Sequence, residues 1–333
     1  MKTFVIAEAG SNHNQNFEQA LKLIEVAKTS GADVCKFQTF SSETVYSKNT
    51  PDFAGYKNIN KLIKDIELPR EWQSDLKKYC DEIGIEFMST PFDEQAVQEL
   101  LDIGVKRFKI AGFESTDFRF VEMVASAKLP IIISMGIGFP LEYIGKLYSV
   151  TEKYETEITL LHCNNAYPTP IEDIRLGTLN DIKYEMMNYP RIKQMGLSDH
   201  TMSTRTPSVA VAMGASVIEK HFTLSRTLDG PDHQFALEPN QLTEMISLIR
   251  ETELMMKSRD TLYTDSELNF IKARRSVVAK KLIKVGDTFT VENITTKRPF
   301  LENCIPAIGF EQLLGKISSQ NYSEDQFIKM EDL

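Results

Sequence analysis

Short apolar runs alternate with helix-like stretches through residues 1–222, and this alternation limits the folds open to the chain more than any other feature. Between the runs, apolar residues recur with the spacing of an amphipathic helix, as they do over residues 17–29. Strands that are separated by helical crossovers pair in parallel. The expected strands span residues 4–8, 34–38, 85–90, 107–110, 130–134, 158–162, 194–198 and 217–221.

The number of these strand–helix units predicts the architecture. Eight units within about 220 residues match a (β/α)8 TIM barrel. An open, doubly wound α/β sheet is the alternative. Such a sheet usually carries a GxGxxG fingerprint after its first strand, whereas this chain has Gly10-Ser11-Asn12-His13-Asn14 at that point. We therefore expect the barrel.

The sequence changes in character after the eighth strand. An amphipathic helix ends at residue 256, a polar stretch follows, and β-rich runs begin near residue 274. We expect a barrel domain over residues 1–256, a linker over 257–273 and a small β-rich domain over 274–333. Within this last domain the strand-like runs are 276–279 and 288–291.

Charge and composition exclude several classes of protein. The chain has 38 Lys and Arg residues against 47 Asp and Glu, a net charge of −9, so nucleic-acid binding is not expected as the main role. Its four cysteines are far apart and form no CxxC pair, which is typical of reduced thiols. The N-terminus becomes acidic too early for a signal peptide, and no apolar run approaches the ~20 residues of a membrane helix. A cytoplasmic protein is expected.

Polar residues stand at the end of nearly every expected strand. The carboxyl ends of barrel strands surround one mouth, where the active sites of such barrels lie. A single polar residue there is usually a cap, but the same feature on eight strands indicates a site. The residues are Glu8, Lys36, Gln38, Ser89, Thr90, Lys109, Glu114, Ser134, His162, Asn165, Ser198, Asp199, His200, Glu219 and His221.

Two residue groups indicate ligands of different kinds. His200 and His221 end neighbouring strands about 4.8 Å apart, so both rings can reach one divalent metal that keeps positions open for water or substrate. Lys36 and Lys109, together with nearby serines, suit a small anion such as a phosphate or carboxylate. An internal structural Lys–Glu pair is the alternative for the lysines.

Several strings of residues along nearly the whole chain belong together. The strings in the expected barrel are Ile6 to Asn14, Lys36-Phe37-Gln38, Ser89 to Asp93, His162 to Pro170, Gly196 to Thr201, Glu219 to Thr223 and Gly230-Pro231-Asp232-His233. These strings resemble the sialic acid synthase family and occur in that family's order. Residues 274–276 and 297–299 resemble its C-terminal antifreeze-like (SAF) domain.

The resemblance implies an enzyme that condenses phosphoenolpyruvate with an open-chain N-acetylated amino sugar. The products would be a nine-carbon 2-keto acid and inorganic phosphate. In such enzymes a manganese or magnesium ion, held by the histidines that match His200 and His221, polarises the sugar aldehyde.

The resemblance also implies a role for each matching residue. Lys36, Lys109, Ser134 and Ser198 would hold phosphoenolpyruvate. Glu8 would lie near the developing cation, and Glu114 near the reacting end of the sugar. The residues expected to line the sugar site are Gln38, Thr90, Asn165, Tyr167 and Asp232.

Members of this family form domain-swapped homodimers in which the SAF domain of one chain supplies an arginine to the sugar of the other. Arg298 matches that arginine. The chain departs from the family pattern at Gly112, where many members have a phosphoenolpyruvate-binding serine, at the bulky Phe113, and over residues 300–306, where glycines are usual. The match thus leaves the neuraminic, legionaminic and pseudaminic branches open.

Three other functions are weaker alternatives. A catalytically silent sugar- or phosphoenolpyruvate-binding regulator on the same barrel would be expected to lack a metal histidine or a lysine, and none is missing. A synthase for a phosphorylated aldose would need a second basic cluster at the mouth. The charged loop over residues 297–303 disfavours an ice-binding face in the C-terminal domain.

Overall fold

The computed structural model describes residues 2–52 and 57–332, and the chain divides into two compact units between Lys257 and Ser258. The outermost residues of the two predicted domains, Met1 and Leu333, lie outside the described residues.

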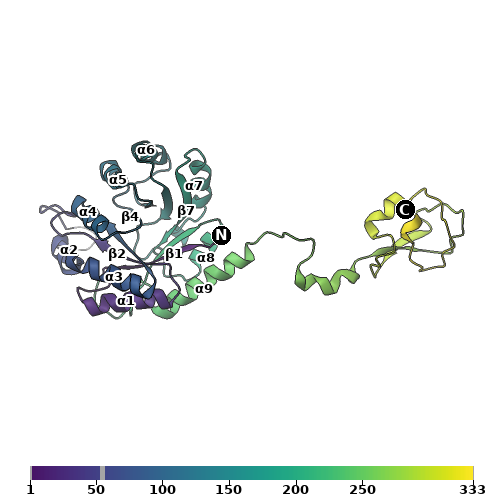
Figure 1. The fold of residues 1–333 in the computed structure, drawn as a ribbon, viewed down its shortest axis with the longest axis horizontal. Coiled ribbons are helices and arrows are strands. Elements are labelled where there is room, and N and C mark those ends of the chain that lie inside the picture. Colours follow the sequence, from purple (N-terminus) through teal and green to yellow (C-terminus); the bar gives the residue numbers. More distant parts are fainter. Residues whose placement is uncertain (1, 53–56, 333) are drawn as a thin grey trace. The chain divides into compact units, whose positions relative to one another are not determined.

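The first unit is a closed barrel of eight parallel strands (Figure 1). The strands pair in the order β3-β2-β1-β8-β7-β6-β5-β4, and the two ends of this order, β3 and β4, also lie side by side. The TIM barrel is therefore confirmed and the open sheet excluded. The strands are β1 (Phe4–Gly10), β2 (Val34–Thr39), β3 (Glu86–Pro91), β4 (Phe108–Ile110), β5 (Ile131–Met135), β6 (Ile158–Cys163), β7 (Ile192–Asp199) and β8 (Val217–His221).

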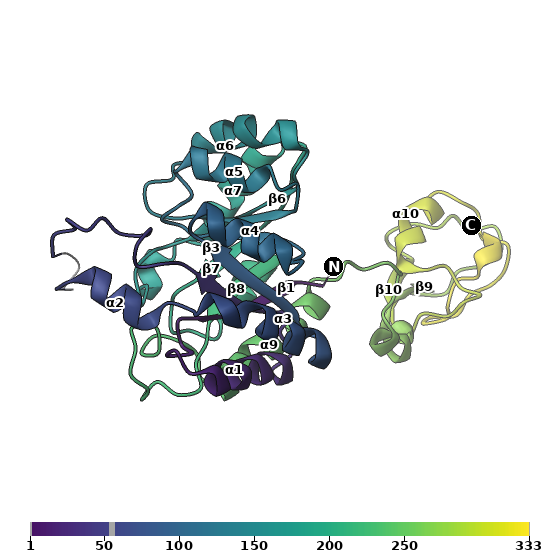
Figure 2. The same cartoon turned by 60° about the vertical axis from the view of Figure 1, so that its left-hand side comes forward.

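Helices cover the outer face of this sheet (Figure 2). Local signals set their ends: Asn16 and Asp93 accept backbone N–H groups as N-caps, and Gly84 ends a helix in the left-handed conformation. No helix among the described residues is long and apolar enough to cross a membrane. The α-helices are α1 (Phe17–Thr29), α2 (Ile59–Ile66), α3 (Gln73–Ile83), α4 (Glu94–Asp102), α5 (Phe118–Ala125), α6 (Tyr143–Thr151), α7 (Thr178–Met186), α8 (Thr206–Ala212) and α9 (Pro239–Met255).

The inside of the barrel is built in two layers, because successive side chains of a strand point to opposite faces. A buried apolar layer comes first, and most of its members are followed two residues later by a polar side chain that faces the same way. The apolar layer is Ile6, Val34, Met88, Ile132, Leu161 and Val217. The residues two positions further on are Glu8, Lys36, Thr90, Ser134, Cys163 and Glu219. The polar layer therefore lies toward the carboxyl ends of the strands.

The second unit has its own small core, formed by side chains such as Val277, Phe289 and Tyr322. Its two antiparallel strands are β9 (Ser276–Ala279) and β10 (Ile294–Lys297), and its α-helix is α10 (Phe310–Leu313). The strand expected over residues 288–291 is wrong. Thr290 accepts the backbone N–H groups of Asn293 and Ile294, so the chain turns there and the strand begins after the turn.

The stretch expected as a linker, residues 257–273, contains a 3-10 helix over Asp265–Ala273. Thr264 and Glu267 form a capping box at its start, which satisfies backbone donors that a helix end leaves unpaired. Other 3-10 turns span Arg70–Trp72, Glu152–Tyr154, Ile171–Asp173, Ala307–Gly309 and Met330–Asp332.

The tight packing of β7 against β8 predicts the effect of adding one methyl group. A Cβ at Gly196 would lie 2.0 Å from the carbonyl oxygen of Val217 and 2.7 Å from Leu161 Cδ2. We expect Gly196→Ala to lower the free energy of unfolding by about 1–3 kcal/mol or more, as overpacked cores do. Gly177→Ala is the matched control, because a Cβ there meets nothing within 4 Å. Chemical denaturation measures both, and equal stability of the two variants would contradict this packing.

Candidate active site

Two lysines and two glutamates form a buried ion network inside the barrel. Lys36 Nζ lies 3.0 Å from Glu8 Oε2 and 3.4 Å from Glu219 Oε2. Lys109 Nζ lies 3.5 Å from Glu219 Oε1. All four residues are buried, and register places Glu8 beside Lys36 on neighbouring strands. When Glu8 is ionised, two positive and two negative charges balance each other, which limits the cost of removing them from water.

The two carboxyl groups of this network differ in acidity. Burial raises the pKa of Glu8 to about 7, although Lys36 acts in the opposite direction. Burial also disfavours the charged form of Glu219, but Lys109 and Lys36 outweigh it and lower the pKa of Glu219 to about 2. Glu8 is therefore the member that can gain a proton near neutral pH, while Glu219 stays ionised.

Hydroxyl and amide groups complete the network. The structure brings together the four residues predicted to bind an anion and pairs their two lysines with glutamates, as the structural alternative also predicts. Anion binding itself stays a prediction. The contacts are Lys36 Nζ to Thr90 Oγ1 (3.0 Å), Lys109 Nζ to Ser134 Oγ (2.8 Å), Ser198 Oγ to Glu219 Oε1 (2.9 Å) and Gln38 Nε2 to Glu8 Oε1 (2.6 Å).

The two predicted metal ligands lie next to each other at the carboxyl ends of β7 and β8. The ring centroids of His200 and His221 are 5.3 Å apart. Burial lowers the pKa of His200 to about 4 and that of His221 well below its usual range. Both rings are thus neutral at physiological pH, which is the form that ligates metal ions.

The free ring nitrogens fit a divalent cation. The carbonyl oxygen of Asn164 lies 2.6 Å from His200 Nδ1, and a proton on that nitrogen leaves the Nε2 lone pair available. His221 Nδ1 is buried without a hydrogen-bond partner and lies 4.0 Å from Asp232 Oδ2. The described residues hold no cluster of three His, Cys, Asp or Glu side chains arranged for a metal, so water or substrate would fill the other positions.

A cavity of about 550 Å³ opens beside His221 at the barrel mouth. Gln38, Glu114, Tyr167, His221 and Asp232 line it, so five predicted site residues share one space. The ring of Tyr167 lies 4.3 Å from that of His200, centroid to centroid. A cavity of this size suits a small organic ligand.

Two residues expected to bind sugar are also held by the protein. Asn165 Oδ1 accepts the backbone N–H of Ile137 at 2.7 Å, and Asn165 Nδ2 donates to the Tyr167 hydroxyl at 3.2 Å. Asp232 accepts the Ser11 hydroxyl at 3.1 Å. These bonds fix the loops that carry the two side chains.

The sequence did not predict two features of the site, which are the contacts of Glu219 and the helix α2. Glu219 was noted only as a strand-end residue, yet it joins both lysines; its position two residues before His221 was the available signal. The helix α2, which lines the cavity, was not expected. Arg298 is an exposed residue of the second unit, and its contact with a sugar stays a prediction.

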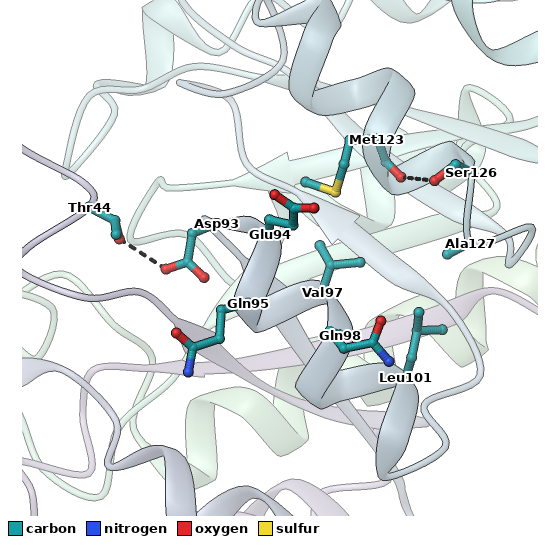
Figure 3. Close-up of a pocket in the computed structure, with 10 residues that line it drawn as sticks. All are labelled: Thr44, Asp93, Glu94, Gln95, Val97, Gln98, Leu101, Met123, Ser126 and Ala127. Carbon is teal, nitrogen blue, oxygen red and sulfur yellow. Dashed lines mark hydrogen bonds between the residues drawn. The ribbon is translucent and has the colours of Figure 1, made fainter.

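A second cavity, of about 840 Å³, lies on the outside of the barrel between α4 and the end of α5 (Figure 3). Thr44 donates a hydrogen bond to Asp93 at its edge, and Asp93 also pairs with Arg70. None of the predicted site residues lines this cavity. The mouth of the barrel is therefore the candidate active site.

The sequence matches the NeuB family over residues 23–261 and the SAF domain over residues 274–333. The chain belongs to the NeuB family. The resemblance to sialic acid synthases and their two-domain architecture is thereby confirmed.

Several relatives of this NeuB family chain are named as acid synthases. The N,N'-diacetyllegionaminic acid synthase of Campylobacter jejuni is 38% identical, over 98% of this chain and 99% of that protein. The pseudaminic acid synthase of the same species is 32% identical, over 99% and 96% of the two chains. A crystal structure of N-acetylneuraminic acid (sialic acid) synthetase from Leptospira borgpetersenii, 30% identical, superposes with a TM-score of 0.73 over 82% and 91%. The NeuB family chain is an enzyme of the synthase type.

The environment of Glu114 predicts a pH-dependent stability difference. Burial raises the pKa of Glu114 to about 7, and its Oε2 atom is buried without a hydrogen-bond partner. The unfolded chain releases this proton at a lower pH than the folded protein, so the free energy of unfolding falls as the pH rises from 4.5 to about 7 and stays lowered above that range. We expect Glu114→Gln to be more stable than the parent by about 1–3 kcal/mol at pH 8. Chemical denaturation from pH 4.5 to 8 measures this difference, which should vanish at the acidic end.

The exposed Glu94 supplies the control for this experiment, since Glu94→Gln should give no such pH-dependent difference. A Glu114→Gln variant that is no more stable than the parent at pH 8 would show that the folded protein stabilises the ionised carboxylate.

Proposed function

We propose that the enzyme condenses phosphoenolpyruvate with an open-chain N-acetylated amino sugar. Carbon 3 of phosphoenolpyruvate forms a bond to the sugar aldehyde carbon, and the aldehyde oxygen gains a proton. Water adds to the cationic carbon 2 and loses a proton, which leaves a hydroxyl on that carbon. The bond from carbon 2 to the phosphate oxygen then breaks, the hydroxyl becomes the ketone as its proton passes to the leaving group, and inorganic phosphate leaves. The product is a nine-carbon 2-keto acid.

One observation carries this proposal: two buried lysines with serine hydroxyls lie inside the barrel, and two neighbouring neutral histidines follow at its mouth, where His221 lines the cavity. The lysines supply positive charge and hydrogen-bond donors for a phosphate or carboxylate. The names of the relatives point the same way, because each is a synthase of an acidic sugar of the sialic acid type.

The chain's own residues have separate tasks in this reaction. Lys36 and Lys109 hold the anionic groups of phosphoenolpyruvate, with the hydroxyls of Ser134 and Ser198 as further hydrogen-bond partners. Glu8 can act in its protonated or its ionised form, because a pKa of about 7 means that both forms are populated near neutral pH. Its ionised form stabilises the positive charge that develops at carbon 2.

The sugar occupies the cavity, with its aldehyde toward the histidines. Glu114 lines the same cavity and faces the reacting end of the sugar, and Gln38, Asn165, Tyr167 and Asp232 contact its hydroxyl and amide groups. A manganese or magnesium ion held by His200 and His221 would supply Lewis-acid polarisation of the aldehyde when bound.

Phosphate release tests the reaction directly. The enzyme is incubated with phosphoenolpyruvate, Mn²⁺ and one of three sugars: N-acetylmannosamine, 2,4-diacetamido-2,4,6-trideoxymannose or its altrose counterpart. We expect release that requires a sugar and stops when EDTA removes the metal. Folded protein that binds phosphoenolpyruvate but releases no phosphate with any sugar would instead support a silent binding protein.

The histidine pair provides the second test. Because His200 and His221 are the neutral buried rings with a free lone pair, we expect His200→Ala or His221→Ala to lower the rate of phosphate release by at least about 100-fold. Metal content, measured by mass spectrometry, should fall in the same variants. His162→Asn is the control, since the His162 ring contacts the carbonyl oxygen of Ile174 instead. A near-normal rate in either alanine variant would contradict the prediction that His200 and His221 bind a metal ion needed for the reaction.

We also propose that the enzyme acts as a domain-swapped homodimer in which Arg298 of one chain contacts the sugar bound by the other. Arg298→Ala is then expected to raise the KM for sugar more than the KM for phosphoenolpyruvate, because the arginine contacts only the sugar. Lys281→Ala, another exposed cation of the second unit, is the control.

Mixing two variants distinguishes a swapped dimer from a site within one chain. Arg298→Ala and His221→Ala should each be impaired alone. After unfolding and refolding together, a mixed dimer holds one site with an intact barrel and an intact arginine. Phosphate release well above both parents supports the swap, and release equal to their average contradicts it.

A further inference from the structure

The lining of the cavity at the barrel mouth combines polar and apolar residues. The polar residues include Gln38, Glu114, His221 and Asp232, and Phe235 packs against His221. The residues that α2 contributes are all apolar and form one face of the helix. The apolar and aromatic residues of the lining, apart from Tyr46 and Tyr167, are Phe40, Val45, Ile59, Leu62, Ile63, Ile66, Phe92, Ala111, Phe113, Pro231 and Phe235.

The helix α2 is amphipathic, and its apolar face points to this cavity. Ile59, Leu62, Ile63 and Ile66 have the spacing of a single helix face, and all four line the cavity. The lysines and the aspartate of the helix are exposed. None of the four apolar residues belongs to the packed core between sheet and helices, so the stripe serves the cavity instead of that core.

Hydrogen bonds from neighbouring loops hold this helix in place. Gln15 Nε2 donates to the carbonyl oxygens of Lys64 and Glu67 at 2.9 and 3.1 Å. Asn60 Nδ2 donates to the carbonyl oxygen of Ser47 at 3.1 Å, and the Asn58 side chain caps the N-terminus. Both ends are therefore held through polar atoms, and the apolar face is left for a ligand.

The positions of the reacting groups decide which part of a sugar meets this face. The aldehyde carbon has to lie near His221 and the buried lysines, away from α2, which contributes only apolar residues to the lining. The far end of the sugar chain then extends toward α2. A hydroxyl group placed against Leu62 or Ile66 would lose its hydrogen bonds to water, whereas a methyl group would be favoured there.

We propose that α2 is the specificity element of the enzyme and selects a 6-deoxy sugar that carries two acetamido groups. The terminal methyl and the acetamido methyl remote from the aldehyde pack on Leu62, Ile63 and Ile66. A hexosamine with hydroxyls at carbons 4 and 6, such as N-acetylmannosamine, is discriminated against. This inference rests on the proposed condensation reaction and assigns its sugar class.

The sugar panel measures the preference itself. We expect kcat/KM for 2,4-diacetamido-2,4,6-trideoxymannose or for its altrose counterpart to exceed that for N-acetylmannosamine by about 100-fold, the size of discrimination that hydrophobic pockets achieve. Comparable values, or a preference for N-acetylmannosamine, would overturn the inference and leave the condensation intact. No sugar-dependent release at all would overturn both.

Variants of α2 test whether the helix is the cause. Leu62→Asn and Ile66→Thr place polar atoms on the apolar face without emptying it. We expect the KM for the preferred sugar to rise about tenfold or more, the KM for N-acetylmannosamine to change less than about threefold, and the KM for phosphoenolpyruvate to stay constant. Lys61→Ala, on the exposed face of the same helix, is the matched control.

A merely structural helix would give a different result. Loss of α2 packing would lower kcat/KM for both sugars equally and leave the ratio of the two values unchanged. The same equal loss, joined to a change in dimer formation, would mean that a second chain covers the apolar face. Either result overturns the specificity role.

Discussion

The pairing of two buried lysines with two buried glutamates determines what the rest of the barrel mouth can hold. An unpaired charge in this position would cost several kcal/mol of stability. The balanced set lets Lys36 and Lys109 remain inside a protein interior, where their charges act on a ligand with little screening by water. The same strands then continue upward by two residues, from Lys36 to Gln38 and from Glu219 to His221. The positions of Gln38 and His221 therefore depend on the paired residues that precede them by two positions on the same strands.

Much of the barrel could be predicted from the sequence because its signals are local. Apolar runs, helix caps and the two-residue alternation within strands are all contained in short windows, and parallel pairing places the strand ends together. The convergence of Glu8, Lys36, Ser198 and His221 follows from that geometry alone.

The features that escaped prediction depend on contacts between distant residues. Glu219 gains its importance from lysines on β2 and β4, more than 100 residues earlier in the chain. The second strand of the small unit was placed too early, because the turn formed by Thr290 and Asn293 is recognised only from its hydrogen bonds. The helix α2 is short, and its four apolar residues are too few to distinguish a helix from a loop by sequence alone. The cavity that they face explains their spacing.

The glycine that replaces the family's serine has a structural explanation in this chain. The loops after β4 and β5 approach so closely that a Cβ at Gly136 would lie 2.6 Å from Gly112 Cα and 2.1 Å from Asn165 Oδ1. A Cβ at Gly112 would lie 2.8 Å from the same oxygen. A serine at position 112 would therefore push Asn165 away from Ile137 and Tyr167. The chain loses a hydroxyl at this point and gains a fixed Asn165 at the mouth.

The barrel is closed without α2, since none of the eight strands pairs with that helix and the two ends of the strand order, β3 and β4, lie side by side. An element that the scaffold does not require can change its sequence without loss of the fold, whereas Glu219 or Lys36 cannot. The chemistry of the reaction thus resides on the strands, in charged pairs that constrain one another. The proposed choice of sugar resides on a helix whose apolar face lines the ligand cavity. Substrate range can then diverge among such barrels while the condensation machinery stays the same.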